Sequence, residues 1–453
     1  METISVNQQG QSQLDDFSAY LQHESWTRQQ LEDYKARALR ACREYAYARS
    51  PFYQHFHRGL MDRPLQDLPV LTKAMMMEHF DDLVTDRAVR LHDVQQYLDR
   101  ADATKPYLDR YRVMATSGSS GRPGFFLSGL AELAIMINTY SRSLSWGRVT
   151  PESRAASVVS AAPGHLTAQA PIIVNGKHLD TLRLSSMDRL ETLVHRLNEY
   201  QPDILFPYPT IAATLAEEQR QGRLHIAPRS IFYAGEMMPS DMRRRIEEAW
   251  QTKLFQAYAT TESGALAAEC EMHQGMHLFE DFTIVEVVDE DNRPVPAGTQ
   301  GAKVLLTVLF RRTQPLIRYE ISDLVRLSTS ERCPCGRPFA LLESIQGRTG
   351  EMLYLPSHSG REEGITPLQF ETVFDMLPIS GWQVIQEQDG LHILLTGASQ
   401  QLRDEEVLDK LRRVLSGRGV IVPPMQIQRV TQLTTNASGK IPMLISHVPP
   451  RAS

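Results

Sequence analysis

Between residues 155 and 262, short hydrophobic segments alternate with segments in which hydrophobic residues recur every three or four positions. Leu190, Leu193 and Leu197, for example, fall on one face of a helix. The predicted strands are residues 155–161, 202–208, 229–236 and 253–262, and the predicted helices are residues 187–200, 210–221 and 239–250. Strands that alternate with helices of this length predict a parallel sheet covered by helices on both faces.

The pattern differs on both sides of this segment. Residues 27–53 are polar and carry Leu31, Ala38 and Cys42 at helical spacing, so a helical N-terminal region is expected. From His277 onward, hydrophobic and polar positions alternate around short turn segments, which is typical of β structure.

The last hundred residues, by contrast, look like a separate α+β unit. Strands are predicted near 381–387 and 391–396, followed by a helix at 404–415. The expected fold is therefore α/β. A large domain, residues 1–346, would have mixed or parallel sheets covered by helices plus a β subdomain, and a small α+β domain would span residues 347–453.

Composition restricts the class of partner. The 453 residues are 42% hydrophobic and 23% charged, and the formal net charge is −6. That balance argues against nucleic acid or an anionic membrane as the main partner. The chain has no apolar run of the ~20 residues that a membrane span needs, and no signal peptide is recognisable. We therefore expect a cytoplasmic protein whose four cysteines are thiols or metal ligands.

Residues 116–124, TSGSSGRPG, lie between two predicted strands, YRVMA and FFLSG. Backbone N–H groups, hydroxyls and glycines in such a loop can hold an anion, and Arg122 could donate to phosphate oxygens. The loop matches neither the Walker pattern nor the nucleophile elbow. Taken alone, it is more typical of a flexible surface turn.

Further motifs follow downstream. Glu262 ends the segment YATTE and is placed to hold Mg²⁺, a cation that prefers oxygen ligands. Asp323 ends RYEISD and could accept hydrogen bonds from ribose hydroxyls. Arg348 follows Gly347, and Lys440 ends NASGK. Each alone is also typical of a solvated surface charge, and the sequence contains no convincing Ser/His/Asp or Cys/His dyad.

Taken in this order, the motifs resemble those of the adenylate-forming superfamily, and most of all those of the phenylacetate–CoA ligase family. The resemblance extends from about Ser50 to Lys440 and includes the segments ARSPFYQHF and CPCGR. It implies ATP, Mg²⁺ and coenzyme A as cofactors, a small-molecule carboxylic acid as substrate, and a mobile small domain.

The same resemblance implies a role for each motif. The β- and γ-phosphates of ATP would be held by Thr116, Ser117, Gly118, Ser119, Ser120 and Gly121, with Arg122 beside them. Adenine would lie along Ala234, Gly235 and Glu236, with Tyr258 stacked on it. Thr261 and Glu262 would bind phosphate and Mg²⁺, Asp323 the ribose, and Arg348 ribose or phosphate. Lys440 would contact both the carboxylate and the α-phosphate.

These roles fit the chemistry of acid activation. Attack of a carboxylate on the α-phosphorus concentrates negative charge on phosphate oxygens, which a lysine, a metal and backbone donors stabilise. The adenylate would then pass its acyl group to coenzyme A. An amine, a carrier-protein thiol or another nucleophile is the alternative acceptor, and a non-catalytic nucleotide-binding protein is the second alternative. A homodimer is possible.

Three positions depart from the family pattern. Arg122 replaces the usual lysine, which keeps the charge but changes the donor geometry. Ser322 replaces a glycine in the ribose motif. Gly350, followed by Glu351, stands where an acidic hinge residue is usual. The last departure puts the second half-reaction in doubt, so adenylation is the more secure expectation.

The cysteines suggest a structural metal site. Cys270, Cys333 and Cys335 with one histidine would make a closed Cys₃His zinc site. His277 is preferred to His273 because GMH resembles the family's G-x-H. Free buried thiols are the alternative.

The acyl pocket is expected to be formed by residues 160–171, by 205–210 including Tyr208, and by the residues before Glu236. Apolar surface with one or two hydroxyls fits an aryl or similar planar acid. Tyr208 and Phe206 could equally be ordinary core residues.

Overall fold

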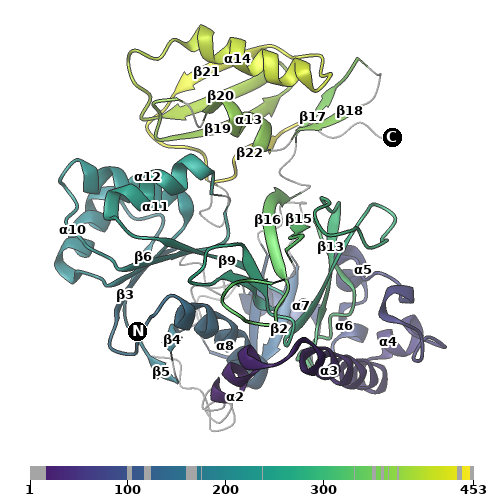
Figure 1. The fold of residues 1–453 in the computed structure, drawn as a ribbon. Coiled ribbons are helices and arrows are strands. Elements are labelled where there is room, and N and C mark those ends of the chain that lie inside the picture. The colour runs from purple at the N-terminus through teal and green to yellow at the C-terminus, as the bar shows by residue number, and fades with distance from the viewer. Residues whose placement is uncertain are drawn as a thin grey trace.

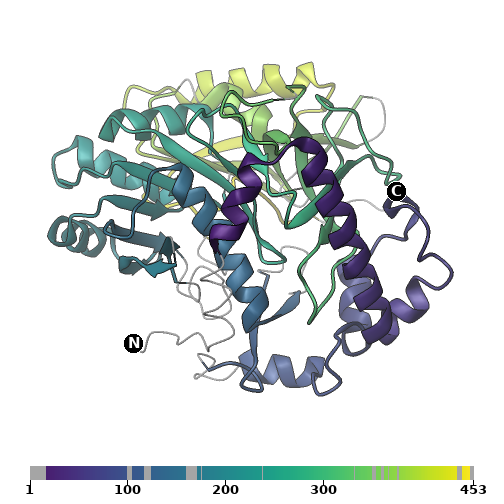
Figure 2. The same ribbon diagram turned by 60° about the horizontal axis from the view of Figure 1, so that its bottom comes forward.

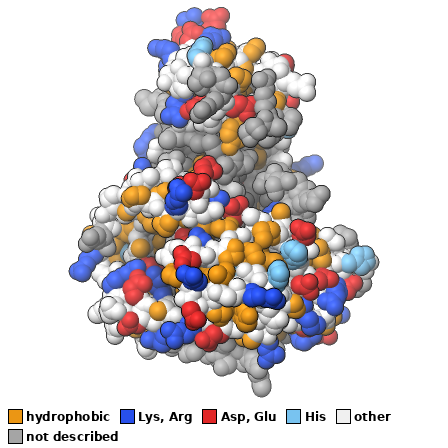
Figure 3. Space-filling model, turned by 90° about the vertical axis from the view of Figure 1, so that its right-hand side faces the viewer, with side chains coloured by type: hydrophobic (Ala, Val, Ile, Leu, Met, Phe, Trp, Pro, Cys, Tyr) orange, Lys and Arg blue, Asp and Glu red, His pale blue; other side chains and the backbone are white. Residues whose placement is uncertain are grey.

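The computed structural model describes residues 17–98, 105–116, 124–159, 171–174, 176–236, 238–330, 332–348, 353–358, 362–365, 367–374, 377–435 and 441–448. Within this part of the chain a large domain carries a smaller one, which stands above it in Figure 1. Figure 3 shows the narrower small domain above the broad large domain, with charges of both signs mixed on the visible face. No helix in the described ranges is long and apolar enough to cross a bilayer.

A nine-stranded mixed sheet forms the centre of the large domain, in the order β15-β16-β11-β10-β9-β8-β7-β3-β6. From β6 to β9 the neighbouring strands are parallel, and from β9 to β15 they are antiparallel. The strands are β3 (Arg154–Val159), β6 (Asp180–Ser185), β7 (Ile204–Pro207), β8 (Ser230–Tyr233), β9 (Leu254–Thr260), β10 (Gly264–Glu269), β11 (Met276–Leu278), β15 (Asp323–Leu327) and β16 (Leu341–Arg348).

Helices cover both faces of the parallel strands, as the alternating pattern predicts. Leu205 and Ile231 pack on one face with α10 (Leu190–Tyr200), α11 (Pro209–Arg220) and α12 (Ser240–Trp250). Their strand neighbours Ile204 and Phe232 pack on the other face with Leu144 of α8 (Leu130–Trp146). Adjacent strand residues face opposite sides, so each strand contributes to two hydrophobic cores.

The N-terminal helices and the β subdomain lie together beside the main sheet (Figures 1 and 2). In the long helix α3 (Arg28–Arg49), the Cys42 thiol lies 3.7 Å from the Val308 carbonyl oxygen of β13. A capping box between Thr27 and Gln30 begins the helix. The other elements here are α2 (Phe17–Gln22), η1 (His23–Ser25), α4 (Pro51–Phe56), η2 (Leu65–Asp67), α5 (Lys73–Glu78), α6 (Phe80–Leu83), α7 (Leu91–Leu98), β12 (Thr283–Val288), β13 (Lys303–Val308) and β14 (Tyr319–Ile321).

Two short hairpins complete the large domain. The first joins β1 (Tyr111–Ala115) to β2 (Phe125–Gly129), and these are the strands predicted on either side of the TSGSSGRPG loop. The second joins β4 (Ile173–Val174) to β5 (Lys177–His178).

The small domain has a hydrophobic core of its own, which begins at Leu353, whereas the core of the large domain extends to Ile345. The predicted strands and helix are confirmed as β19 (Gly381–Glu387), β20 (Gly390–Thr396) and α14 (Asp404–Gly417). The change of core between residues 345 and 353 agrees with a division near residue 347, which stays a prediction. The remaining elements are β17 (Leu353–Pro356), β18 (Glu362–Ile365), α13 (Pro367–Phe374), β21 (Met425–Arg429) and β22 (Leu444–Ser446).

Candidate active site

The loop predicted to bind phosphate closes at its base between Thr116 and Gly124. The Thr116 N–H donates to the Gly124 carbonyl at 3.0 Å, and the Gly124 N–H donates to Thr116 Oγ1 at 2.9 Å. Ser117, Gly118, Ser119, Ser120, Gly121 and Arg122 lie outside the described residues. The structure therefore fixes the two ends of the loop at the tip of the β1–β2 hairpin.

A buried arginine connects this hairpin to the predicted magnesium-binding turn. Thr261 and Glu262 lie in the turn between β9 and β10. Arg311 Nε donates to the Glu262 carbonyl at 2.5 Å, and Arg311 Nη1 donates to the Leu127 carbonyl of β2 at 2.7 Å. Loss of solvation lowers the pKa of Arg311, and Glu132 and Glu262 partly offset this effect. Sequence reasoning missed Arg311, although it lies only seven residues before the ribose motif begins.

The predicted adenine and ribose residues lie together. The Tyr258 hydroxyl donates to Asp323 Oδ2 at 2.5 Å, and both side chains are buried. Asp323 pairs across the strands with Arg348, whose side chain lies outside the described part of the chain. Three residues that are far apart in sequence thus meet at the ends of β9, β15 and β16.

The segment after β8 connects the two domains. Gly235 has a φ of 86°, a conformation that favours glycine. Glu236 accepts hydrogen bonds from Thr210 of α11 and from the N–H of Ile441 in the small domain. Lys440, the residue before Ile441, lies outside the described residues.

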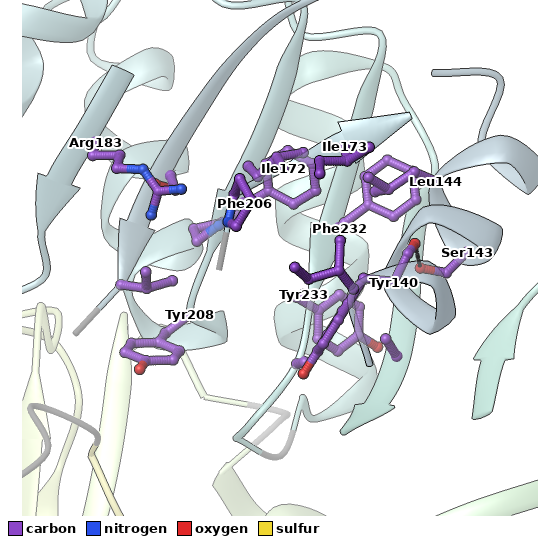
Figure 4. Close-up of a pocket in the computed structure, with 17 residues that line it drawn as sticks. Tyr140, Ser143, Leu144, Ile172, Ile173, Arg183, Phe206, Tyr208, Phe232 and Tyr233 are labelled. Atoms are coloured by element: carbon purple, nitrogen blue, oxygen red, sulfur yellow. Dashed lines mark hydrogen bonds between the residues drawn. The ribbon is translucent and has the colours of Figure 1, made fainter. Parts of the chain in front are cut away.

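A cavity of about 150 Å³ lies between the parallel strands and α8. Aromatic and aliphatic side chains form most of its wall, and Figure 4 shows them facing a common space. Tyr208 and Phe206 line it, as do Tyr233 and Ala234 just before Glu236. Of the predicted segment 160–171, only Pro171 is described, and it also contributes to the wall.

This wall also carries polar side chains that were not predicted, of which Tyr140 and Arg183 are the largest. Tyr140 comes from α8, and burial raises the pKa of its hydroxyl. Arg183 comes from β6, and loss of solvation lowers the pKa of its guanidinium. Neither belongs to a recognisable motif, so only the folded arrangement identifies them.

The predicted metal ligands also meet. The ligand atoms of Cys270, His277, Cys333 and Cys335 all lie within 4.8 Å of one another. Cys270 Sγ is 3.7 Å from Cys333 Sγ, and Cys335 Sγ is 3.3 Å from His277 Nε2. Two sulfurs bound tetrahedrally to zinc at about 2.3 Å would be about 3.8 Å apart, so the spacing fits this metal.

The ring of His277 is oriented for such a role. Its Nδ1 lies 3.3 Å from the Phe339 carbonyl, which leaves Nε2 facing the thiols. Burial lowers the pKa of His277 to about 4 and raises the pKa of Cys270 to about 12. His273 instead lies 3.5 Å from Glu269 and against the ring of Phe255. The preference for His277 therefore agrees with the geometry.

A mixed α/β sheet with a small second domain has its candidate site at the carboxyl ends of its parallel strands, the place where open α/β sheets bind their ligands. Residues 31–305 match the sequence profile described as AMP-binding enzyme, and the chain belongs to that family. The resemblance to the adenylate-forming superfamily is thereby confirmed.

Individual relatives indicate which members of the family this chain resembles. The chain is 27% identical over 390 residues to a phenylacetate-coenzyme A ligase of Thermus thermophilus, covering 81% of this chain and 80% of the relative. A phenylacetate-coenzyme A ligase of Escherichia coli is 26% identical over 57% of this chain and 59% of its own length. A fumarate–(S)-2,3-diaminopropanoate ligase of Enterobacter agglomerans is 22% identical, covering 58% of this chain and 64% of the relative.

Solved structures support the same fold. A 2-hydroxyisobutyryl-CoA ligase in its postadenylation state superposes with a TM-score of 0.74 at 21% identity, covering 94% of this chain and 91% of that one. The same enzyme in its thioesterification state, with the same coverage and identity, gives a TM-score of only 0.60. This chain therefore superposes better on the first of these two structures than on the second.

Proposed function

We propose that the protein uses Mg²⁺ and ATP to activate a carboxylic acid and then transfers the acyl group to coenzyme A. The observation that carries the proposal is that an apolar cavity, the Glu262 turn and the Tyr258–Asp323 pair all lie at the carboxyl ends of the parallel strands. Membership of the AMP-binding family and the similarity to phenylacetate-coenzyme A ligases support it.

The first step joins the acid to AMP. A carboxylate oxygen attacks the α-phosphorus, the bond to the bridging oxygen of the β-phosphate breaks, and pyrophosphate leaves. Glu262 would offer carboxylate oxygens to Mg²⁺, and the ion would neutralise phosphate charge. Lys440 would stabilise the charge on the α-phosphate, and Asp323 would hold the ribose.

The second step forms the thioester. The thiol of coenzyme A loses its proton to solvent and attacks the acyl carbon, and the bond between that carbon and the phosphate oxygen of AMP breaks. AMP is a good leaving group, so this step needs no nucleophile from the protein.

We further propose an aryl or similar planar acid as the substrate. Phe206, Phe232 and Tyr233 present flat surfaces around a cavity of about 150 Å³, a volume that suits a ring better than a long chain. Tyr140 is one of the polar groups on this wall, and its hydroxyl could form a hydrogen bond with a ring substituent.

Carboxylate-dependent exchange of pyrophosphate into ATP across a panel of acids tests the proposal. We expect exchange with one or more aryl acids and a thioester only when coenzyme A is added. Absence of exchange with every acid would leave a nucleotide-binding protein without turnover.

The role of Lys440 is tested in the same assay. Lys440→Ala should lower the exchange strongly, and undiminished exchange would remove this lysine from the mechanism.

An amine acceptor is the second candidate. It is favoured by Gly350 in place of an acidic hinge residue, and by the similarity to a ligase named for joining fumarate to an amino acid. Mass spectrometry of products with and without coenzyme A, and with amines supplied, separates the two candidates. A carrier protein, a homodimer and a cytoplasmic location stay predictions.

We also propose that Cys270, His277, Cys333 and Cys335 bind zinc. Four protein ligands close the coordination shell, so the metal would be structural. It would join the β10–β11 region to the segment before β16 and take no part in the reaction.

A further inference from the structure

The carboxylate of Glu236 joins two parts of the chain that are more than two hundred residues apart. Its Oε2 accepts from the Thr210 N–H at 3.1 Å and from Thr210 Oγ1 at 2.9 Å. Its Oε1 accepts from the Ile441 N–H at 3.1 Å. Thr210 belongs to the large domain and Ile441 to the small one, so one side chain bridges both.

The large-domain half of this bridge replaces a missing helix cap. Tyr208, the N-cap residue of α11, makes no capping hydrogen bond with its own side chain. Glu236 supplies the acceptor instead, and its negative charge is favourable at the helix N-terminus. The helix thereby holds the carboxylate in place, with Oε1 available to the small domain.

The small-domain half of the bridge, the hydrogen bond from Ile441, lies next in sequence to a residue proposed to act in the reaction. Ile441 follows Lys440, so the hydrogen bond constrains the backbone next to the lysine proposed to act in adenylation. A second contact between the domains joins Arg245 of α12 to the Ile379 carbonyl. This chain superposes better on the postadenylation structure of 2-hydroxyisobutyryl-CoA ligase than on its thioesterification structure.

We propose that Glu236 is a positioning residue that holds the small domain in the orientation used for acid activation. The inference deepens the proposed function and rests on it. The hydrogen bond to Ile441 must break when the small domain takes another orientation, so Glu236 favours the first half-reaction over the second.

The substitution Glu236→Gln should break the contact with Ile441 and keep the contact with Thr210. An amide has a single acceptor oxygen, and Thr210 offers two donors to it. The glutamine NH₂ would then face the Ile441 N–H, and two donors cannot pair. The variant is expected to keep the helix cap and lose the tether, so its melting temperature should stay close to that of the wild type.

Hydrogen exchange of the full chain tests the tether without any substrate. In Glu236→Gln, peptides that contain Ile441 should exchange about tenfold faster, the scale of one lost charge-assisted hydrogen bond. The matched control is Thr210→Val, which removes a donor on the large-domain side and leaves the Ile441 bond. It should not change exchange at Ile441. Equal exchange in the wild type and Glu236→Gln would overturn the tether.

Separate assays of the two half-reactions test whether the tether affects catalysis. Pyrophosphate exchange should fall about tenfold in Glu236→Gln, whereas thioester formation from a supplied acyl-adenylate, which shares any contact of Glu236 with adenine, should fall by a clearly smaller factor. An equal loss in both steps would indicate a merely structural role and would contradict the proposal. If the wild type activates no acid, the proposed function fails, and the exchange experiment still decides whether the tether exists.

Discussion

Arg311 lies between the two segments predicted to bind the phosphates and the metal. Its guanidinium is fully buried and donates to the carbonyls of Glu262 and Leu127. A buried carbonyl that loses its donor costs about 1–3 kcal/mol. Arg311 therefore stabilises the relative position of the Glu262 turn and the β1–β2 hairpin, although nothing in its sequence context marks it.

We predict that Arg311→Met lowers the free energy of unfolding by about 2–4 kcal/mol, because two buried carbonyls lose their donor. It should also raise the KM for Mg-ATP more than the KM for the acid. Urea denaturation and steady-state kinetics measure the two effects. The adjacent, half-buried Arg312 donates to the Leu309 and Arg311 carbonyls and provides the control for the kinetic effect. An equal rise in the KM for Mg-ATP in Arg312→Met would contradict a specific role for Arg311.

Tyr140 is the residue on which substrate choice should depend. It comes from α8 and lies on the wall of a mostly apolar cavity, to which Arg183 and Tyr208 also contribute. A site that can hydrogen-bond a substrate group discriminates against analogues lacking that group.

Tyr140→Phe should therefore lower kcat/KM about tenfold for acids that carry a ring hydroxyl or amino group, the scale of one hydrogen bond. Unsubstituted acids should be affected much less. A panel of paired acids, each with and without the substituent, measures the difference. A uniform loss across the pairs would show that the hydroxyl does not contact the substrate.

At the scale of elements, the sequence pattern was most informative where it was periodic. The parallel strands and α10 to α12 were predicted because their core-facing residues recur at fixed spacing, and β1 and β2 because two hydrophobic runs flank a glycine-rich loop. Tyr258 and Asp323 were found through motifs, but their direct hydrogen bond was not foreseen. Contacts such as this one depend on how β9 and β15 are placed in the sheet, which local spacing does not encode.

The Cys/His cluster connects segments that the local hydrophobic pattern does not predict to lie together. Cys270 directly follows β10 and His277 lies in β11, whereas Cys333 and Cys335 come from an irregular segment about sixty residues later. That segment contains no helix or strand among its described residues, so a bound metal would be a main source of its order.

We predict one zinc per chain in the purified protein, measured by inductively coupled plasma mass spectrometry. Cys335→Ser should lose the metal and lower the melting temperature, because an oxygen ligand is much weaker for zinc than a thiolate. Cys42→Ala, at a buried thiol outside the cluster, should keep it. A metal-free wild type whose stability is unaffected by chelators would mean that the thiols are simply buried.

At the scale of the whole molecule, the two hydrophobic cores should unfold separately. One runs through Ile345 of β16 and the other begins with Leu353 of β17. Among the described residues, hydrogen bonds between the domains include those from Arg245 to Ile379 and from Ile441 to Glu236. Such hydrogen bonds contribute little stability compared with either hydrophobic core, so the domains should not unfold as one unit.

Hydrogen exchange in increasing urea tests this expectation. Peptides from β19 and β20 should lose protection at lower urea than peptides from β7 and β8, because the smaller domain buries a smaller fraction of its surface. Glu236→Gln should leave both midpoints nearly unchanged, since it alters orientation more than either core. Coincident midpoints in the wild type would mean that the domains unfold as one cooperative unit, and the small domain would then be less free to change its orientation between half-reactions.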